Sequence, residues 1–209
     1  MKKNSQLFKI GNKIIGEKFP AFFIAEAGIN HNGSLKIAKK MVDSAYEFDA
    51  DAVKFQTFKA DDLTSPQSIY HNLFKKLELS DSDFGEISDY ARSKKIIFLS
   101  TPFSNNAVDL LTKLRVPAFK IASGDLTDLP LIRYAALKQK PMLLSTGMAT
   151  LDEIGLSIKQ ILKTKNRKIC LFHSVSSYPT PYNETNLLAM NTIKKKFPYP
   201  VGFSDNGDD

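Results

Sequence analysis

The sequence predicts an α/β protein with the fold of a (β/α)8 TIM barrel, truncated after its seventh strand. Three observations predict this fold. Short apolar runs alternate with helical patterns, successive runs are about 30 residues apart, and nearly every run ends in polar, small or charged residues. A ring of such residues at the carboxyl ends of all strands is typical of a barrel, whereas a doubly wound sheet places its chemistry on one or two loops.

Seven strands are expected. Each candidate is short, rich in β-branched or aromatic residues and apolar at consecutive positions, which is the pattern of parallel strands covered on both faces. The candidates span residues 22–25, 52–55, 96–99, 119–122, 142–144, 169–172 and 201–203.

Helix signals lie between these strands. Ser34 is a candidate N-cap for the helix after the first strand. Thr150 and Glu153 have the spacing of a capping box, and apolar residues follow them at helical spacing. Ser104 precedes another apolar helical pattern, and Pro130 stands where a first-turn proline is expected.

The strand count does not complete a barrel. A barrel typically needs about 250 residues and eight strands, and this chain of 209 residues ends soon after its seventh candidate. We therefore interpret residues 1–209 as one incomplete barrel domain. The stretch 7–15 has the pattern of an antiparallel hairpin around Gly11 and Asn12, which makes it a candidate plug for the barrel floor and a poor substitute for the eighth strand.

Composition points to a soluble protein with a substantial core. Hydrophobic residues make up 43% and charged residues 24% of the chain, and no apolar run approaches the roughly 18 residues of a membrane-spanning helix. No secretory signal is predicted, because lysines interrupt the apolar segment near the N-terminus. Cys170 is the only cysteine, which excludes an internal disulfide and suits a reducing compartment. The protein is therefore expected in the cytoplasm, without a membrane partner.

The charge balance is basic. The chain has 29 Lys and Arg against 22 Asp and Glu, a formal net charge of +7. The lysine pairs and triplets are scattered, without interleaved aromatic residues or a nucleic-acid recognition motif. We interpret most of the excess as solvated helix surface and expect no nucleic-acid partner. Buried lysines directed at an anionic small molecule would account for part of it.

Six strand-end motifs follow one another along the chain: FIAEAGINHNG at 23–33, DAVKFQ at 51–56, LSTPF at 99–103, FKIASG at 119–124, LSTGM at 144–148 and SYPTP at 177–181. In this order they resemble the sialic acid synthase family, which makes N-acetylneuraminate, legionaminate, pseudaminate and spore-coat sugars. The resemblance extends from residue 8 to residue 205.

The resemblance implies a phosphoenolpyruvate-binding barrel that catalyses an aldol-type condensation. In the family, carbon 3 of phosphoenolpyruvate attacks the aldehyde of an open-chain N-acetylated hexosamine, water adds at carbon 2, and phosphate leaves. A divalent metal, manganese or magnesium, polarises the aldehyde. The family forms homodimers in which a small C-terminal antifreeze-like domain covers the partner's active site, and this chain is expected to lack that domain.

The resemblance also implies a set of site residues. Lys54 and Lys120 suit a ligand with a phosphate and a carboxylate, because such a ligand needs positive and hydrogen-bonding groups from several strands. Glu26 and Asp125 match carboxylates near the reacting centre and are the candidate catalytic groups. The positions that match phosphoenolpyruvate contacts are Lys54, Gln56, Thr101, Lys120, Ser123, Ser145, Ser176, Tyr178 and Ser204.

Two positions depart from the family pattern. The family usually has Glu where Asp125 stands, so the carboxylate here keeps its charge but has a shorter reach. The family's seventh strand runs Ser-Asp-His-Thr, with the histidine as a metal ligand, whereas this chain has Asn206 there. An amide oxygen binds transition metals far less well than imidazole, and the second histidine ligand of the family belongs to the eighth strand. We therefore expect weak metal binding and impaired or no synthase activity.

Two other interpretations remain open. A class I aldolase would use Lys54 or Lys120 as a Schiff base, although a ring of hydroxyls suits a phosphate better than the desolvated pocket that such a lysine needs. A non-catalytic remnant would bind phosphate compounds or nothing. Among the histidines, His31 is expected to fix the loop after the first strand, and His173 is either a core residue or a site residue.

Overall fold

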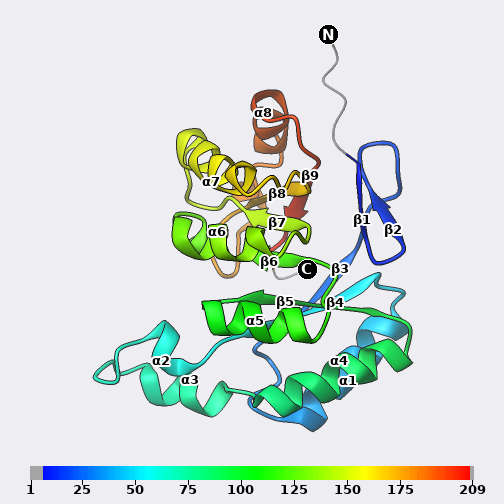
Figure 1. The fold of residues 1–209 in the computed structure, drawn as a ribbon, viewed down its shortest axis with the longest axis vertical. Helices are drawn as coiled ribbons and strands as arrows, with labels where there is room; N and C mark the ends of the chain where they lie inside the picture. Colours follow the sequence, from blue (N-terminus) through cyan, green and yellow to red (C-terminus); the bar gives the residue numbers. More distant parts are fainter. Residues whose placement is uncertain (1–6, 208–209) are drawn as a thin grey trace. The chain divides into compact units, whose positions relative to one another are not determined.

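The computed structural model describes residues 7–207. These residues form two compact units, one of residues 22–117 and one of residues 118–207 together with residues 7–21. Each unit is an α/β structure built on its own parallel sheet (Figure 1). No helix in the described range has the length and apolar character needed to span a bilayer.

The 22–117 unit contains a three-stranded parallel sheet whose strands are adjacent in chain order. Phe55, Ile87, Leu99 and Leu111 are fully buried in its core. The elements are β3 (Ile24–Gly28), α1 (Leu35–Glu47), β4 (Ala52–Thr57), α2 (Ala60–Leu63), α3 (His71–Leu77), α4 (Asp81–Ser93), β5 (Ile97–Pro102) and α5 (Asn105–Lys113).

The 118–207 unit contains a four-stranded parallel sheet, again in chain order. Helices α6 and α7 pack side by side in it (Figure 1). The antiparallel hairpin of β1 (Phe8–Ile10) and β2 (Lys13–Ile15) belongs to this unit and turns at Gly11 and Asn12, where the sequence predicts the turn. The remaining elements are β6 (Phe119–Ile121), α6 (Leu129–Leu137), β7 (Met142–Ser145), α7 (Leu151–Lys163), β8 (Ile169–Ser174), α8 (Ala189–Lys196) and β9 (Val201–Ser204).

The strand order confirms the βα repeat within each unit. Within each of the two parallel sheets, every strand pairs with the next one in the chain, so neither sheet shows the reversal of order that marks a doubly wound fold. All seven expected parallel strands are present, with ends that differ from the predicted ones by up to three residues. Closure into an eight-stranded barrel and truncation after the seventh strand stay predictions.

The first parallel strand is predicted too early. The sequence predicts it at 22–25, but β3 begins at Ile24, and Phe23 is 61% exposed. The backbone of Phe23 instead contacts the start of β4: its N–H donates to the Asp51 carboxylate (2.9 Å), and its carbonyl accepts from the N–H groups of Asp51 and Ala52. Aromatic composition therefore marks the strand region without fixing where the strand ladder begins.

The predicted helix starts are confirmed. Ser34 and Ser104 each accept a hydrogen bond from the backbone N–H three residues later (3.3 Å). Thr150 and Glu153 form a reciprocal capping box at the start of α7, and Pro130 lies in the first turn of α6. Each cap satisfies an N–H group that the first helical turn leaves unpaired, which is worth about 1 kcal/mol.

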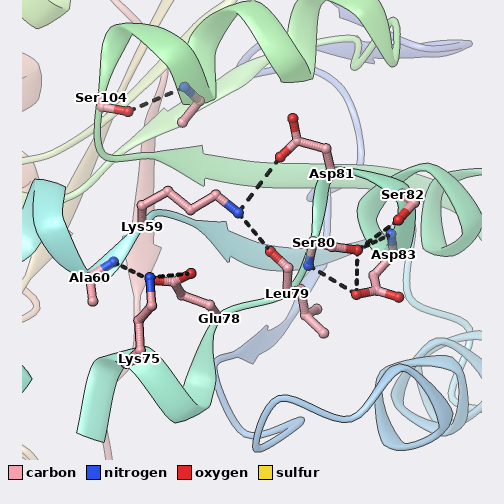
Figure 2. Close-up of polar contacts among 11 residues, drawn as sticks. Lys59, Ala60, Lys75, Glu78, Leu79, Ser80, Asp81, Ser82, Asp83 and Ser104 are labelled. Carbon is pink, nitrogen blue, oxygen red and sulfur yellow. Dashed lines mark hydrogen bonds and ion pairs between the residues drawn. The ribbon is translucent and has the colours of Figure 1, made fainter. Parts of the chain in front are cut away.

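A polar clamp fixes the long connection between β4 and β5 (Figure 2). Lys59 Nζ donates to the carbonyl of Leu79 (3.3 Å) and pairs with Asp81 (3.8 Å). The Glu78 carboxylate accepts the Ala60 N–H (2.7 Å) at the start of α2. These contacts tie together both ends of the α2–α3 segment, so that the chain leaves β4 and enters α4 in a fixed geometry.

Candidate active site

Lys54 lies at the centre of a polar cluster in the 22–117 unit. It is 6% exposed, and its Nζ forms an ion pair with Glu26 and donates a hydrogen bond to Thr101 Oγ1 (3.3 Å). The three residues come from adjacent strands, and Glu26 is the direct register partner of Lys54. Burial of an unpaired charge costs several kcal/mol, so these partners are what allow an ammonium group in this position.

The alternation of side chains along the strands decides which residues join this cluster. Gln56 lies two residues beyond Lys54 and is in register with Thr101, so it shares their face of the sheet. Thr57 and Ser100 lie on the other face, where their buried hydroxyl oxygens are 2.7 Å apart and tie the two strands together. The face therefore brings together four of the predicted site residues: Glu26, Lys54, Gln56 and Thr101.

Three of the four charged candidate residues lie inside strands, which corrects the sequence prediction for Glu26, expected just after a strand that ends at residue 25. Glu26 is the third residue of β3, Lys54 the third of β4, and Lys120 the second of β6. The strand ladders continue through these positions, because a polar side chain on one face does not stop backbone pairing. The Glu26 side chain is 52% exposed, so its carboxylate faces both Lys54 and solvent.

His31 fixes the loop that follows β3, as the sequence predicts. It is buried, and its Nδ1 accepts a hydrogen bond from the Gly33 N–H (3.1 Å), which places the proton of the neutral ring on Nε2. Burial lowers the pKa of His31, so the neutral ring is favoured. Gly33 has a φ of +72°, and a Cβ there would collide with the Lys76 carbonyl, so only glycine lets this loop pack against the end of α3.

In the 118–207 unit a second cluster is built around Lys120. It is 6% exposed, its Nζ donates to Ser145 Oγ, and the same nitrogen lies 5.4 Å from the centroid of the Phe172 ring. Lys120 is in register with Leu143, and Ser145 with Phe172, so these side chains share one face of the sheet. Gly202 makes room for the ring, since a Cβ there would lie 2.9 Å from it. A hydroxyl oxygen and an aromatic face thus hold the buried ammonium.

A second close approach lies just after β7, at Gly147. Its N–H donates to Ser123 Oγ (3.1 Å). A Cβ at this position would lie 2.7 Å from Ser176 Oγ, 2.8 Å from Ser123 Oγ and 3.1 Å from the carbonyl oxygen of Ser174. The absence of a side chain therefore lets two predicted site hydroxyls gather beside one backbone N–H. Gly147 is a candidate site residue that the sequence analysis misses, although the motif that contains it is among the six.

Asp125 lies in a 3-10 turn, Ser123–Asp125, that follows β6. It is half-buried, and its Oδ2 is buried without a hydrogen-bond partner in the part of the chain that the structure describes. Burial, and secondarily the repulsion of Asp128, raise the pKa of Asp125 to about 6. A carboxyl group that titrates near pH 6 can both donate and accept a proton close to neutral pH, as a general acid–base requires.

Replacing Asp125 by Asn should stabilise the protein above pH 6 but not at pH 4. The folded state holds the Asp125 proton more tightly than the unfolded state, so this favourable contribution is present at low pH and is lost as the pH rises through about 6. After a discount for partial exposure, we expect about 1–2 kcal/mol between the two limits. Unfolding free energies of D125N and of the exposed control D89N, measured from pH 4 to pH 8, test this. A D125N effect that does not vary with pH would contradict it.

The remaining predicted residues lie at the ends of β8 and β9. Ser204 is the register partner of Ser174, and both continue the sheet face that carries the second cluster. Asn206 Nδ2 donates to the carbonyl of Val175 (2.5 Å) and to Ser174 Oγ (3.4 Å). Tyr178 is 79% exposed, and no hydrogen bond or ring contact joins it to the other described site residues. Ser174 is the second residue that the sequence analysis misses.

The described residues around Asn206 do not fit a transition-metal ion. The side-chain amide nitrogen of Asn206 donates a hydrogen bond to the carbonyl of Val175. The Asp205 carboxylate accepts a hydrogen bond from the Gly207 N–H (2.9 Å). Within residues 7–207, there is no group of three or more His, Cys, Asp or Glu side chains that could hold a metal ion. Imidazole, thiolate or several carboxylates normally provide the affinity for such ions. The weak metal binding expected from the sequence stays a prediction.

His173 is a core residue. Its Nε2 donates to the carbonyl of Thr185 (2.8 Å), and its ring stacks on Phe203 with centroids 5.9 Å apart. It is the neighbour of Phe172 along β8, so it lies on the opposite face of the sheet from Lys120. This position decides between the two interpretations that the sequence leaves open.

Known proteins resemble this chain in sequence and in fold. Residues 41–208 match the model of the NeuB family. The uncharacterized protein MJ1065 of Methanocaldococcus jannaschii is 48% identical over 95% of this chain and 59% of its own length. The N,N'-diacetyllegionaminic acid synthase of Legionella pneumophila is 39% identical over 94% of this chain and 60% of its own length.

A solved structure is also similar to this chain in fold and in sequence. The N-acetylneuraminic acid (sialic acid) synthetase from Leptospira borgpetersenii serovar Hardjo-bovis, in complex with citrate, matches with a TM-score of 0.93 at 35% identity, over 97% of this chain and 71% of that one. The chain spans about six-tenths of the length of the curated relatives that it matches. The motif resemblance is confirmed, and the chain belongs to the NeuB family.

Proposed function

We propose that this chain provides the phosphoenolpyruvate-binding part of a nonulosonic acid synthase. Carbon 3 of phosphoenolpyruvate attacks the aldehyde carbon of an open-chain N-acetylated hexosamine, water adds at carbon 2, and phosphate leaves. The observation that carries this proposal is the buried ammonium of Lys120, bonded to Ser145 on a sheet face that also presents Ser174 and Ser204. The names of the relatives from L. pneumophila and L. borgpetersenii support the same reaction class.

The second cluster has the donors that phosphoenolpyruvate needs. A phosphate and a carboxylate bind best to cations and hydroxyl or N–H donors in a site from which water is largely excluded. Lys120 offers the cation, and Ser145 and Ser204 offer hydroxyl groups on the same face. Ser123 accepts the Gly147 N–H, which leaves its own hydroxyl proton available to a ligand oxygen.

Each unit contains a carboxyl group whose chemistry suits proton transfer. The aldehyde oxygen must gain a proton as it becomes a hydroxyl, and the water that adds at carbon 2 must lose one. Asp125, with its pKa of about 6, suits the first step as a general acid. Glu26, in the 22–117 unit, has the chemistry of a general base, because its carboxylate is half exposed and is held by Lys54. Gln56 and Thr101 offer further donors beside this pair.

The alternatives have less support. A Schiff-base lysine needs a free amine, whereas Lys54 is engaged by Glu26 and Thr101 and Lys120 by Ser145. A non-catalytic remnant would not need the polar side chains of both clusters to be arranged around buried lysines. On its own this chain is expected to bind phosphoenolpyruvate with impaired or no turnover, and the homodimer of the family stays a prediction.

Thermal melting and chemical trapping together test the proposal. Phosphoenolpyruvate at about a hundredfold its Kd should raise the melting temperature by roughly 5–10 °C, because a ligand that binds only the folded state stabilises it. Pyruvate with borohydride should leave no covalent adduct detectable by mass spectrometry. An adduct on Lys54 or Lys120 would establish the aldolase interpretation, and no response to phosphoenolpyruvate would favour the remnant.

A further inference from the structure

Charge in the 118–207 segment is sorted between the two ends of its sheet. Every described acidic residue of this segment follows a strand, on the side where the strands end. From the last turn of the preceding helix to the start of β7, β8 and β9, all charged residues are cations, in the runs 138–140, 163–168 and 194–196. Parallel neighbouring strands begin at the same edge of a sheet, so these three runs gather at one edge, named here the basic edge.

Hydrogen bonds lock two of these runs together. Buried Asn166 donates from Nδ2 to the carbonyl of Lys140 (2.7 Å) and accepts the Lys168 N–H at Oδ1 (3.0 Å). Gln139 Nε2 donates to the carbonyl of Thr164 (2.8 Å), and Lys168 Nζ donates to the carbonyl of Gln139 (3.0 Å). The cations of the basic edge are therefore carried by a fixed backbone frame.

Five cations of this edge have no acidic partner among the described residues. Lys194 pairs with Glu17 (3.2 Å). Lys163, Lys165, Arg167, Lys195 and Lys196 are exposed and form no ion pair with any described acid. Burial, followed by repulsion from Lys168, lowers the pKa of Lys140, which shows that like charges lie close together here.

Helix stability accounts for only part of the pattern. A cation in the last turn of a helix is stabilised by the helix dipole, and this covers Lys163 in α7 and residues 194–196 in α8. The effect falls off beyond the last turn, where Arg167 and Lys168 lie, and Lys168 also repels Lys140. The additional cations therefore indicate an anionic partner outside the described chain.

We propose that the basic edge binds the surface of an anionic lipid bilayer. A folded protein partner requires a hydrophobic centre to its interface, and a single-stranded nucleic acid requires exposed aromatic side chains for stacking. Leu137 is the one large apolar side chain that is exposed in or next to the three runs within the described residues. Lysines on flexible stems suit a fluid layer of anionic headgroups, where each adds roughly fivefold to the affinity.

This inference goes beyond the proposed function and does not depend on it. It revises the expectation of no membrane partner, which considers only spanning segments, because binding at the surface requires none. Ser145, Ser174 and Ser204 are the last residues of their strands, so they lie at the opposite end of the sheet from the basic edge. A unit bound through this edge would keep its phosphoenolpyruvate residues open to solvent.

Co-sedimentation with lipid vesicles tests the proposal. Wild-type protein should bind vesicles of phosphatidylcholine mixed with phosphatidylglycerol, but not vesicles of pure phosphatidylcholine. Salt at 1 M should release the bound protein, because the Debye length then falls to about 3 Å. The variant K163Q/R167Q/K195Q/K196Q should bind about a hundredfold more weakly or worse. The matched variant K36Q/K40Q/K76Q/K159Q removes the same charge from exposed helix positions and should stay within severalfold of wild type.

Each other outcome overturns the proposal. Equal weakening in both variants would show that binding follows net charge and not this edge. Failure of wild type to bind anionic vesicles while it binds duplex DNA or an acidic peptide would assign the edge to that class of partner. Thermal melts establish that both variants fold. If the fourfold variant does not fold, K195Q/K196Q serves in its place, with an expected loss of about tenfold or more.

Discussion

Replacing Lys120 by Met should greatly reduce the rise in melting temperature that phosphoenolpyruvate gives the wild-type protein. The ammonium of Lys120 is buried on the proposed ligand-binding face, where it is bonded to Ser145. A charge-assisted hydrogen bond contributes about 1.5–3 kcal/mol, so its loss weakens binding by roughly ten- to a hundredfold. At about a hundredfold the wild-type Kd, the shift in the variant should then fall to between about one half and one seventh of the wild-type shift.

Two comparisons separate loss of binding from loss of folding. Methionine fills a similar volume and removes the desolvation cost of a buried ammonium group, so the unliganded variant should melt near the wild-type temperature. Lys159→Met removes a lysine from the exposed side of α7 and should keep the full ligand shift. A full shift in Lys120→Met would show that Lys120 does not contact the ligand.

The βα repeat is predictable from the sequence because parallel strands covered on both faces leave long apolar runs. The strand ends are less predictable, since β4 continues through Gln56 and Thr57 and β8 through His173 and Ser174. In the sequence, polar residues within a strand resemble the residues that end one. In the structure, backbone pairing between the strands continues through these positions. The short helices α2 and α3 depend on the clamp at Lys59, which is a tertiary contact and leaves no periodic signal.

The candidate site is predictable where residue type carries the chemistry. Lys54 and Lys120 stand out because a lysine within an apolar strand needs a partner or a ligand. The pairing of Glu26 with Lys54 depends on strand register, which the misplaced start of β3 hides. Gly147 contributes by the absence of a side chain, and only the neighbouring hydroxyl oxygens in the folded protein reveal this role.

Replacing Gly147 by Ala should weaken phosphoenolpyruvate binding by tenfold or more at a moderate cost in stability. The new Cβ would meet Ser176 Oγ at 2.7 Å and Ser123 Oγ at 2.8 Å, so both hydroxyl groups must move. Overpacking of this kind costs about 1–3 kcal/mol, and displaced hydroxyls no longer meet the ligand. Isothermal titration with phosphoenolpyruvate and chemical denaturation measure the two effects separately.

A neighbouring glycine and a double variant make this prediction specific. Gly124 lies in the same group of loops, and a Cβ there would meet nothing within 4 Å, so Gly124→Ala should leave both affinity and stability unchanged. Adding Ser123→Ala to Gly147→Ala removes one of the two clashing oxygens, so stability should partly recover. Affinity should not recover, because the Ser123 hydroxyl is then missing altogether. Recovery of affinity together with stability would mean that Ser123 only crowds the loop and that its hydroxyl does not bind the ligand.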